Sequence, residues 1–405
     1  MTDEQEVFLR CLADFCRGEE TPPPKKMPDA EALLSLARKH SVSGVIYLQC
    51  GSWLDDHMKR EAYAGEFTKD VFFSINREDM LGELARCFHD ARVPVICMKG
   101  SVFRDCWPVP EIRTMGDIDL IIREEDRLPA DKIMMKGLRC KKSVENHAVW
   151  SYAYGPLEFE IHDHMFYEYL ANRFDYREYF DKVWEHKEHG TVFGVADDSL
   201  YVPEPEFHFL YLMAHTARHI INNGSGFRAF LDMVFFTRKY SEKLDWTRLE
   251  AELERLQLLK FTKTCFRLCE RWFEVEMPLK SEEIEEEFFL SVTQKICSDG
   301  VFGRGNPQNE AAGTAKDLER SKYPYAIASA MLTFRMVFPT YSNMQLNKRY
   351  AWVDGRPWLM PAAWVYRWLY CLINKKDMSV KRLSEPFSKK ELVDKRQQYN
   401  RSWGL

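Results

Sequence analysis

The sequence predicts an α+β protein, in which a small mixed sheet is flanked by an N-terminal helical segment and a large C-terminal helical region. Three observations support this fold class. The apolar run from Val93 to Met98 is too short for an exposed helix and is typical of a buried strand. The alternating segments HAVWSYAYG and PLEFEIHDH favour adjacent antiparallel strands. From Glu204 onward, apolar residues recur at intervals of three and four, which indicates helices.

The N-terminal segment is predicted to be helical. A proline-rich connector, Thr21–Ala30, separates a first helix from a second helix at Glu31–His40. The helical pattern resumes at Met58 and continues to Ala91. We therefore expect an N-terminal helical segment at residues 1–75, an α+β core at 76–200 and a C-terminal helical region at 201–405.

The core is expected to begin with a strand, a turn and a helix. The strand that ends at Met98 is followed by Lys99-Gly100-Ser101 and by the helix-like stretch SVFRDCW. Backbone N–H groups at the start of such a helix can hold an anion, and Lys99 and Ser101 add a cation and a hydroxyl. The alternative interpretation is an ordinary strand-to-helix turn. A second strand is predicted in GDIDLII, and a further helix across Pro129–Gly137.

Composition places the chain among ordinary globular proteins. It has 405 residues, of which 45% are hydrophobic, and this is enough for a sizeable core. Its net charge of −5 gives no global basic field for nucleic acid or an anionic membrane. No run approaches the roughly 18 uninterrupted apolar residues of a membrane helix, and the N-terminus lacks the pattern of a signal peptide. We therefore expect a cytoplasmic protein without membrane contact.

Two aspartates in GDIDLII point to a metal site. Strand alternation places Asp117 and Asp119 on one face, with Ile118 and Leu120 on the other. At ~4 Å and an effective dielectric constant of 20, two such charges repel by roughly 4 kcal/mol. One must therefore be protonated, unless water or a cation lies between them. Hard oxygen ligands favour Mg²⁺ or Mn²⁺, although two exposed aspartates at a strand end are the alternative.

A third carboxylate follows on a later strand. The apolar residues of PLEFEIHDH share one strand face, which leaves Glu158, Glu160 and His162 on the other. The two glutamates stand roughly 6.6 Å apart along the strand, so only one of them can share a metal with the aspartates. Arg113 lies four residues before Asp117 and has the guanidinium fork to reach phosphate oxygens, with a surface arginine as the alternative. Such a set is what two-metal transfer from a nucleoside triphosphate requires.

These residues resemble a known family. The order of a strand, Gly-Ser, a helix and then Asp-Ile-Asp-Leu resembles the nucleotidyltransferase superfamily that includes DNA polymerase beta. The stretch MKGSVF…EIRTMGDIDLII is similar to its uncharacterised bacterial nucleotidyltransferase branch. That branch combines a Lys-Gly turn, an arginine shortly before Asp-x-Asp, and an acidic residue two positions before a histidine. The resemblance is strong from about Val93 to His162 and weaker in the helices that follow.

The resemblance implies metal ligation by Asp117, Asp119 and Glu160, with catalysis by the same three residues. Of the two glutamates, we expect Glu160 to be the ligand because it lies two residues before His162. Bound Mg²⁺ or Mn²⁺ would activate the attacking oxygen and neutralise charge on the leaving pyrophosphate.

The resemblance also implies that Gly100 and Ser101 contact the triphosphate, and we expect Lys99 and Arg113 to add positive charge to this nucleotide site. Lys99 stands where the superfamily usually has a small or apolar residue before its glycine. The predicted function is therefore metal-dependent transfer of a nucleoside monophosphate from a nucleoside triphosphate to an acceptor hydroxyl, with release of pyrophosphate.

The sequence does not identify the acceptor, which is a small molecule, a glycan, a protein or RNA. Two other functions are compatible with the sequence. One is a catalytically idle member of the fold that binds nucleotide or a partner. The other is a sugar-nucleotide glycosyltransferase that uses Asp-x-Asp to hold a diphosphate, although this function explains neither Lys-Gly-Ser nor the later Glu-Ile-His.

Further polar residues lie on the predicted helices after Glu204. His208, His215 and His219 share one helix face, and we expect hydrogen-bonded core or cleft histidines there rather than a zinc site. Arg228 and Asp232 are one turn apart, and we expect them to form a structural pair.

Overall fold

The computed structural model describes most of the chain. The described residues are 1–53, 57–145, 149–166, 170, 174–222, 224–280, 283–301, 303, 318, 323–341, 344, 348–353, 355–374 and 390–405. The chain forms two compact units, Met1–Asn306 with Ser402–Leu405, and Pro307–Arg401. The predicted division at residues 75 and 200 stays a prediction, and residue 75 lies within one continuous helix, α4 (His57–Asp90).

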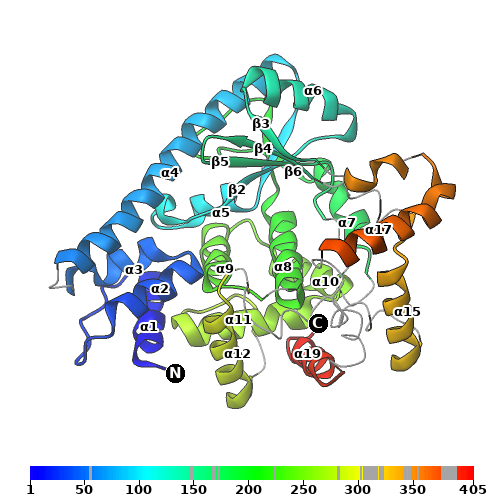
Figure 1. Ribbon diagram of the computed structural model, residues 1–405. Helices are drawn as coiled ribbons and strands as arrows, with labels where there is room; N and C mark the ends of the chain where they lie inside the picture. The colour runs from blue at the N-terminus through cyan, green and yellow to red at the C-terminus, as the bar shows by residue number, and fades with distance from the viewer. Residues whose placement is uncertain are drawn as a thin grey trace. The chain divides into compact units, whose positions relative to one another are not determined.

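The first unit contains a mixed sheet of seven strands in the order β3-β4-β5-β2-β1-β7-β6 (Figure 1). The central strand β2 runs parallel to β5 and antiparallel to β1, and β1 runs parallel to β7. The bounds of the strands are β1 Val95–Met98, β2 Asp117–Ile121, β3 Lys141–Glu145, β4 Val149–Tyr154, β5 Leu157–His162, β6 Lys187–His189 and β7 Leu200–Pro203. The predicted α+β class is confirmed, as are the strands expected in GDIDLII and on either side of the Gly155-Pro156 turn.

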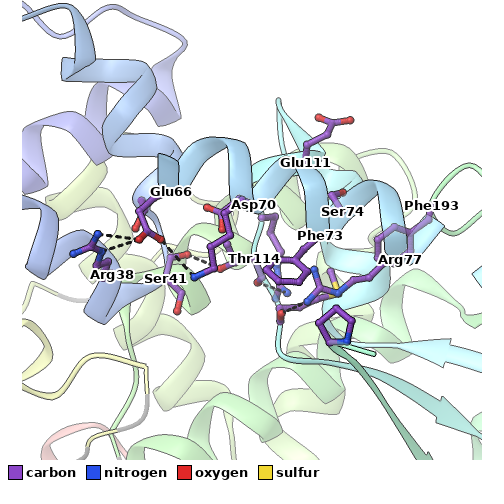
Figure 2. A pocket seen from close by; sticks show the side chains of 15 residues that line it. Arg38, Ser41, Glu66, Asp70, Phe73, Ser74, Arg77, Glu111, Thr114 and Phe193 are labelled. Carbon is purple, nitrogen blue, oxygen red and sulfur yellow. Dashed lines mark hydrogen bonds and ion pairs between the residues drawn. The ribbon is translucent and has the colours of Figure 1, made fainter. Parts of the chain in front are cut away.

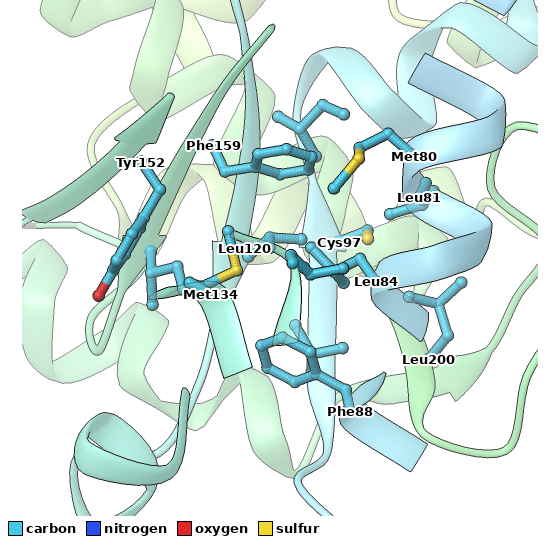
Figure 3. Close-up of a cluster of buried hydrophobic side chains, with 14 of the residues drawn as sticks. Met80, Leu81, Leu84, Phe88, Cys97, Leu120, Met134, Tyr152, Phe159 and Leu200 are labelled. Atoms are coloured by element: carbon cyan, nitrogen blue, oxygen red, sulfur yellow. The ribbon is translucent and has the colours of Figure 1, made fainter. Parts of the chain in front are cut away.

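One face of this sheet is apolar and packs against α4. Figure 3 shows Leu81, Leu84 and Phe88 of α4 beside Leu120 and Phe159 of the sheet. All five side chains are fully buried, and each such burial contributes about 1.5–3 kcal/mol of transfer free energy. Because strand residues alternate between faces, this packing turns the aspartates of β2 and the glutamates of β5 to the opposite face.

Helices make up the rest of the first unit. Those before the sheet are α1 Asp3–Arg17, α2 Ala30–His40, α3 Ser43–Cys50 and α4. Those within the sheet region are α5 Gly100–Phe103, α6 Arg127–Lys132 and α7 Tyr176–Phe180, and those after it are α8 Pro205–Asn222, α9 Phe227–Lys239, α10 Trp246–Arg255, α11 Leu259–Phe273 and α12 Glu286–Asp299. Side-chain caps begin several of them, since Asp29 accepts from the first turn of α2 and Asp245 from that of α10. The helices predicted near Glu31–His40 and Met58–Ala91 are confirmed.

The second unit is helical in its described part. Its helices are α15 Tyr325–Val337, α17 Met360–Asn374 and α19 Lys390–Ser402, the last of which continues into the first unit by one residue. Two small apolar clusters hold it together, one around Val353 and Ala363 and the other around Leu318 and Val393. The stretch GVFGRGNPQNEAAGTAKD at residues 300–317, whose glycines predict a break between helices, lies mostly outside the described residues. Among the described helices, none combines the length and the apolarity of a membrane span.

Candidate active site

The polar face of the sheet carries the candidate site where β5, β2 and β1 lie side by side. In the parallel register of β2 and β5, Asp119 is opposite Glu160. On the other side of β2, Asp119 is opposite Met98, the last residue of β1. Lys99 follows Met98 directly, and its side chain therefore reaches Asp119. Three segments that are distant in the sequence meet at one carboxylate.

Asp119 is the centre of this group and is only 3% exposed. Its Oδ1 accepts a hydrogen bond from Lys99 Nζ at 2.5 Å and lies 3.0 Å from His162 Nε2. His162 Nε2 is also 3.5 Å from Glu160 Oε2. Ligand atoms of Asp119, Glu160 and His162 all lie within 4.8 Å of one another, and these are the residues that could hold a metal ion in the described part of the chain.

Charge within this group keeps Asp119 ionised. Burial favours the neutral acid, but the charge of Lys99 and the hydrogen bond from His162 outweigh it and lower the pKa of Asp119 to about 2. Burial likewise opposes protonation of His162, but its hydrogen bonds to Asp119 and Glu160 raise its pKa. The Lys99 pKa is raised despite burial, chiefly by Asp119. The charge repulsion expected between Asp117 and Asp119 is therefore reduced, because the ammonium group of Lys99 pairs with Asp119.

Asp117 lies at the start of β2, on the same strand face as Asp119 but outside the three-residue group. Burial, followed by the charge of Asp119, raises its pKa to about 6. Its partner in the register is Glu158, which is exposed and accepts a hydrogen bond from Ser143 Oγ at 3.4 Å. Glu160, in contrast, is half-buried and contacts His162. Glu160 therefore lies with Asp119 and His162 in the group that could hold a metal ion, whereas Glu158 does not.

The Lys99 turn has an unusual backbone conformation. Lys99 has φ +55° and ψ −126°, a region that strongly favours glycine. Its N–H donates to Nε2 of His208, a buried histidine of α8, at 3.2 Å. Burial lowers the pKa of His208 to about 3, so the ring is neutral and its Nε2 can accept this hydrogen bond. The turn is thus held in a strained conformation by contacts on both sides.

Gly100 and Ser101 present their backbone rather than their side chains. The hydroxyl of Ser101 donates to the carbonyl oxygen of Met98 at 2.7 Å and is buried. In the described part of the chain, the N–H groups of Gly100 and Ser101 have no hydrogen-bond acceptor. A phosphate contact from this turn would therefore use these two amides and the Lys99 ammonium.

Arg113 makes an internal ion pair. Its Nη2 lies 2.7 Å from Asp232 Oδ2 and its Nε 3.1 Å from Asp232 Oδ1, and both residues are buried. Asp232 also accepts from Trp107 Nε1 at 2.8 Å. The pairing expected between Arg228 and Asp232 was wrong, because Arg113 approaches Asp232 from the segment before β2. Arg228 instead donates to the carbonyl oxygen of Thr114 at 2.8 Å.

Arginines fix the segment that leads into Asp117. Arg228 of α9 binds the carbonyl oxygen of Thr114, and Arg77 of α4 donates to that of Met115 at 2.6 Å. Thr114 in turn donates its hydroxyl to the carbonyl oxygen of Ser41 at 2.9 Å. Helix α4 before the sheet and helix α9 after it therefore hold Thr114 and Met115, which precede Gly116 and Asp117. The sequence spacing of Arg77 and Arg228 did not predict this positioning role.

A cleft of about 450 Å³ borders this segment (Figure 2). Its walls come from α2, α4, the segment before β2 and the turn before β5, and neither Asp119 nor Glu160 lines it. Glu66 pairs with Arg38 at 2.9 Å on this wall. Asp70 has no such partner among the described residues, and burial and then Glu66 raise its pKa to about 7. The cleft is thus polar, with both signs of charge.

Sequence reasoning missed the contacts that three residues make at this site, although it did predict that His208 is a hydrogen-bonded core or cleft histidine. His162 was expected only as a marker beside Glu160, yet its Nε2 contacts both Asp119 and Glu160. Its place on the polar strand face was the signal available in the sequence. His208 contacts the backbone of Lys99, and Arg77 contacts that of Met115. Both partners lie more than 35 residues away, so no local sequence pattern predicts these contacts.

Comparison with known proteins places this geometry in a family. Residues 26–274 match a family described as an uncharacterised nucleotidyltransferase. The chain belongs to that family. The match covers every strand of the sheet, the Lys99 turn, both aspartates and the helices from α2 to α11. No curated protein and no solved structure matches the chain. Membership supports a transferase that acts on nucleotides and leaves the acceptor open.

Proposed function

We propose that the chain transfers a nucleoside monophosphate from a nucleoside triphosphate to an acceptor hydroxyl and releases pyrophosphate. The observation that carries this proposal is the convergence of Asp119, Glu160 and Lys99 on one sheet face, in a chain of the nucleotidyltransferase family. The strand, the Lys-Gly-Ser turn and the Asp-Ile-Asp strand also support a place in the superfamily of DNA polymerase beta, in its bacterial branch.

The residues fit a divalent cation. Asp119 already holds a cation, the Lys99 ammonium, on the oxygen that faces Glu160 and His162. The two carboxylates suit Mg²⁺ or Mn²⁺, and the imidazole of His162 favours Mn²⁺ if it joins the shell. We assign metal binding to Asp119 and Glu160, with Asp117 at the open end of the same strand face. A bound cation would neutralise phosphate charge and polarise the α-phosphate.

In the transfer step, the acceptor oxygen forms a bond to the α-phosphorus while the bond from that phosphorus to the bridging oxygen breaks. Glu160 receives the proton of the acceptor hydroxyl, and pyrophosphate leaves with the bonding electrons. The amides of Gly100 and Ser101 and the ammonium of Lys99 hold the phosphates in line with the acceptor. Arg113 acts through Asp232 and the segment before β2, and we place it in a positioning role.

We place the acceptor in the cleft that Thr114 and Met115 line, because these residues stand three and two positions before Asp117. Its volume of about 450 Å³ is typical of a small-molecule site. Asp70 lines the cleft, so Asp70→Asn should change the KM for the acceptor and leave nucleotide affinity unchanged. An unchanged acceptor KM would remove the acceptor from this cleft.

Pyrophosphate release tests the proposal. ATP, GTP, CTP and UTP are each supplied with Mg²⁺ or Mn²⁺ and with pools of acceptors, and pyrophosphate release is compared between the wild type and three variants. Asp119→Asn keeps the shape of the side chain and removes its charge, so turnover should fall by about 100-fold or more. The turnover of Glu160→Gln should fall by a similar factor, whereas the matched control Glu158→Gln should keep nearly the turnover of the wild type.

The contrary outcomes are distinct. Equal effects of Glu158→Gln and Glu160→Gln would show that the wrong carboxylate has been assigned. Nucleotide binding that depends on metal but yields no pyrophosphate with any acceptor would instead indicate a catalytically idle member of the fold. Nucleotide affinity that is the same with and without EDTA would remove the metal from the site.

A further inference from the structure

Helix α17 of the second unit exposes an apolar face. Its exposed side chains recur at intervals of three and four residues, which places them along one side of the helix. Those that the structure describes are Pro361, Ala362, Val365, Tyr366, Leu369 and Ile373. None of these six is charged, and Leu369 is 54% and Ile373 79% exposed. Because the exposed face of a helix normally carries charged residues, this face is typical of a surface that a partner covers.

Helix α15 repeats the pattern. Its exposed side chains are Ala326, Ile327, Ala330, Met331, Phe334 and Arg335. Of these only Arg335, in the last turn, is charged, and Phe334 is 62% exposed. The buried Ala328 lies on the opposite side and belongs to the cluster around Leu318 and Val393. The helix is therefore apolar both on the side that packs within the unit and on the side that does not.

Aromatic contacts bring the two exposed faces together. The indole N–H groups of Trp364 and Trp368 in α17 donate to carbonyl oxygens at the end of α15 and just beyond it, each at 2.9 Å. The ring centroid of Phe338 lies 5.2 Å from that of each tryptophan, and the ring centroid of Phe334 lies 4.7 Å from that of Phe338. The two apolar faces therefore adjoin each other where α17 passes the end of α15.

Basic residues are concentrated in the same part of the chain. Residues 323–390 contain eleven lysines and arginines and three acidic residues, whereas the whole chain has a net charge of −5. Arg356 is exposed just ahead of α17, and Trp358, two residues later, is 71% exposed. Exposed aliphatic side chains, tryptophan and tyrosine next to an excess of positive charge are typical of proteins that lie on the surface of an anionic bilayer.

The chemistry of these faces favours lipid over other partners. A single-stranded nucleic acid needs aromatic platforms and cations on the same face, whereas most exposed residues of α15 and α17 are aliphatic. A second copy of the chain would bring a second excess of positive charge to the contact, which opposes association. The 15 residues of α17 rise about 22 Å, less than the roughly 30 Å of a hydrocarbon core, so this helix suits the plane of the interface and not a span.

We propose that the exposed faces of α15 and α17 dock on an anionic lipid surface. Their apolar side chains enter the boundary between headgroups and acyl chains, and the neighbouring lysines and arginines pair with the anionic headgroups. This contact is independent of nucleotidyl transfer. It departs from our expectation of no membrane contact, which rested on the charge of the whole chain and on the lack of a spanning segment.

Flotation with lipid vesicles tests this docking in the full chain. Vesicles of phosphatidylcholine alone are compared with vesicles of phosphatidylcholine and phosphatidylglycerol in equal parts, and the wild type should float only with the anionic vesicles. The double variant Leu369→Gln, Ile373→Gln should bind them about 100-fold more weakly, because two apolar side chains that leave water have been removed. The matched control Leu128→Gln changes a side chain that is 70% exposed on α6, and it should bind as the wild type does.

A second double variant tests the electrostatic part and leaves the apolar faces unchanged. Arg335→Gln with Arg356→Gln removes two positive charges, each of which contributes about 5-fold to the affinity for an anionic surface, so binding should weaken by about 10-fold to 30-fold. Binding of the wild type should also weaken as the salt concentration rises, because salt screens this attraction.

Three results would overturn the proposal. One is a wild-type chain that stays in solution with the anionic vesicles. Another is a Leu369→Gln, Ile373→Gln variant that floats as the wild type does and has the same melting temperature. The third is a wild-type dimer that this variant dissociates, without any vesicle binding, which would assign the faces to a second copy. If the glutamine variant of α17 does not fold, the arginine variant decides by the same flotation assay.

Discussion

Replacing Lys99 by glycine and by alanine separates backbone strain from charge at the turn after β1. Both variants remove the ammonium that pairs with Asp119, so the loss of that ion pair cancels in the comparison. The variants differ in the Cβ atom alone. At φ +55° and ψ −126°, a Cβ is strained, and glycine removes the strain.

The expected difference follows from two opposing terms. A residue held in such a region costs about 1–3 kcal/mol. Glycine loses more conformational entropy on folding than alanine, which opposes this gain by about 0.4–1 kcal/mol. Lys99→Gly should therefore be more stable than Lys99→Ala by about 0.5–2 kcal/mol. At most positions alanine is the more stable of the two, so the sign itself is diagnostic.

Urea denaturation followed by circular dichroism measures this difference, with equal m-values as the check that both variants unfold alike. Lys69 provides the control, because it is exposed on the surface of α4. There, glycine should be less stable than alanine by about 1 kcal/mol. If Lys99→Ala is as stable as Lys99→Gly, the turn stores no strain. If both variants bind magnesium pyrophosphate as the wild type does, Lys99 has no role in phosphate binding.

Three further changes test the packing around the site. A Cβ at Gly100 would lie 2.6 Å from Nη1 of Arg113, whose guanidinium is held by Asp232. Gly100→Ala should therefore lower the free energy of unfolding, measured in urea, by about 1–3 kcal/mol. A loss below about 0.5 kcal/mol would show that the Arg113 side chain moves freely to make room. Asp232→Asn leaves Arg113 buried without its counter-charge and should cost about 3–5 kcal/mol in the same assay, whereas an unchanged midpoint would deny the ion pair a structural role. The pKa of Asp70 is raised to about 7, above its value in the unfolded chain, so its contribution to stability is full below about pH 4 and is lost as the pH rises to about 7. Asp70→Asn should remove this loss, and identical pH profiles of stability for the variant and the wild type would contradict the assignment.

Local patterns in the sequence determined the elements that carry the site. Strand periodicity assigned Asp119 and Leu120 to opposite faces of one strand, and Glu160 and His162 to the same face of another. This holds for any pairing partner, because successive residues of a strand always point to opposite faces. The turn at Gly155-Pro156 predicted the hairpin of β4 and β5 for a similarly local reason. The expectation of a cation followed from the same pattern, since two ionised carboxylates on one strand face repel each other unless one is protonated, or water or a cation lies between them.

Only the tertiary structure decided which groups touch. Lys99 meets Asp119 because β1 and β2 pair in one particular register, and a shift of that register by one residue would turn Asp119 to the other face. Arg113 meets Asp232, which lies 119 residues later, because α9 packs beside the segment before β2. The conformation of Lys99 depends on His208, 109 residues away. These contacts arise from the packing of helices against a sheet, which no local periodicity encodes, and they determine which charges remain available for a ligand.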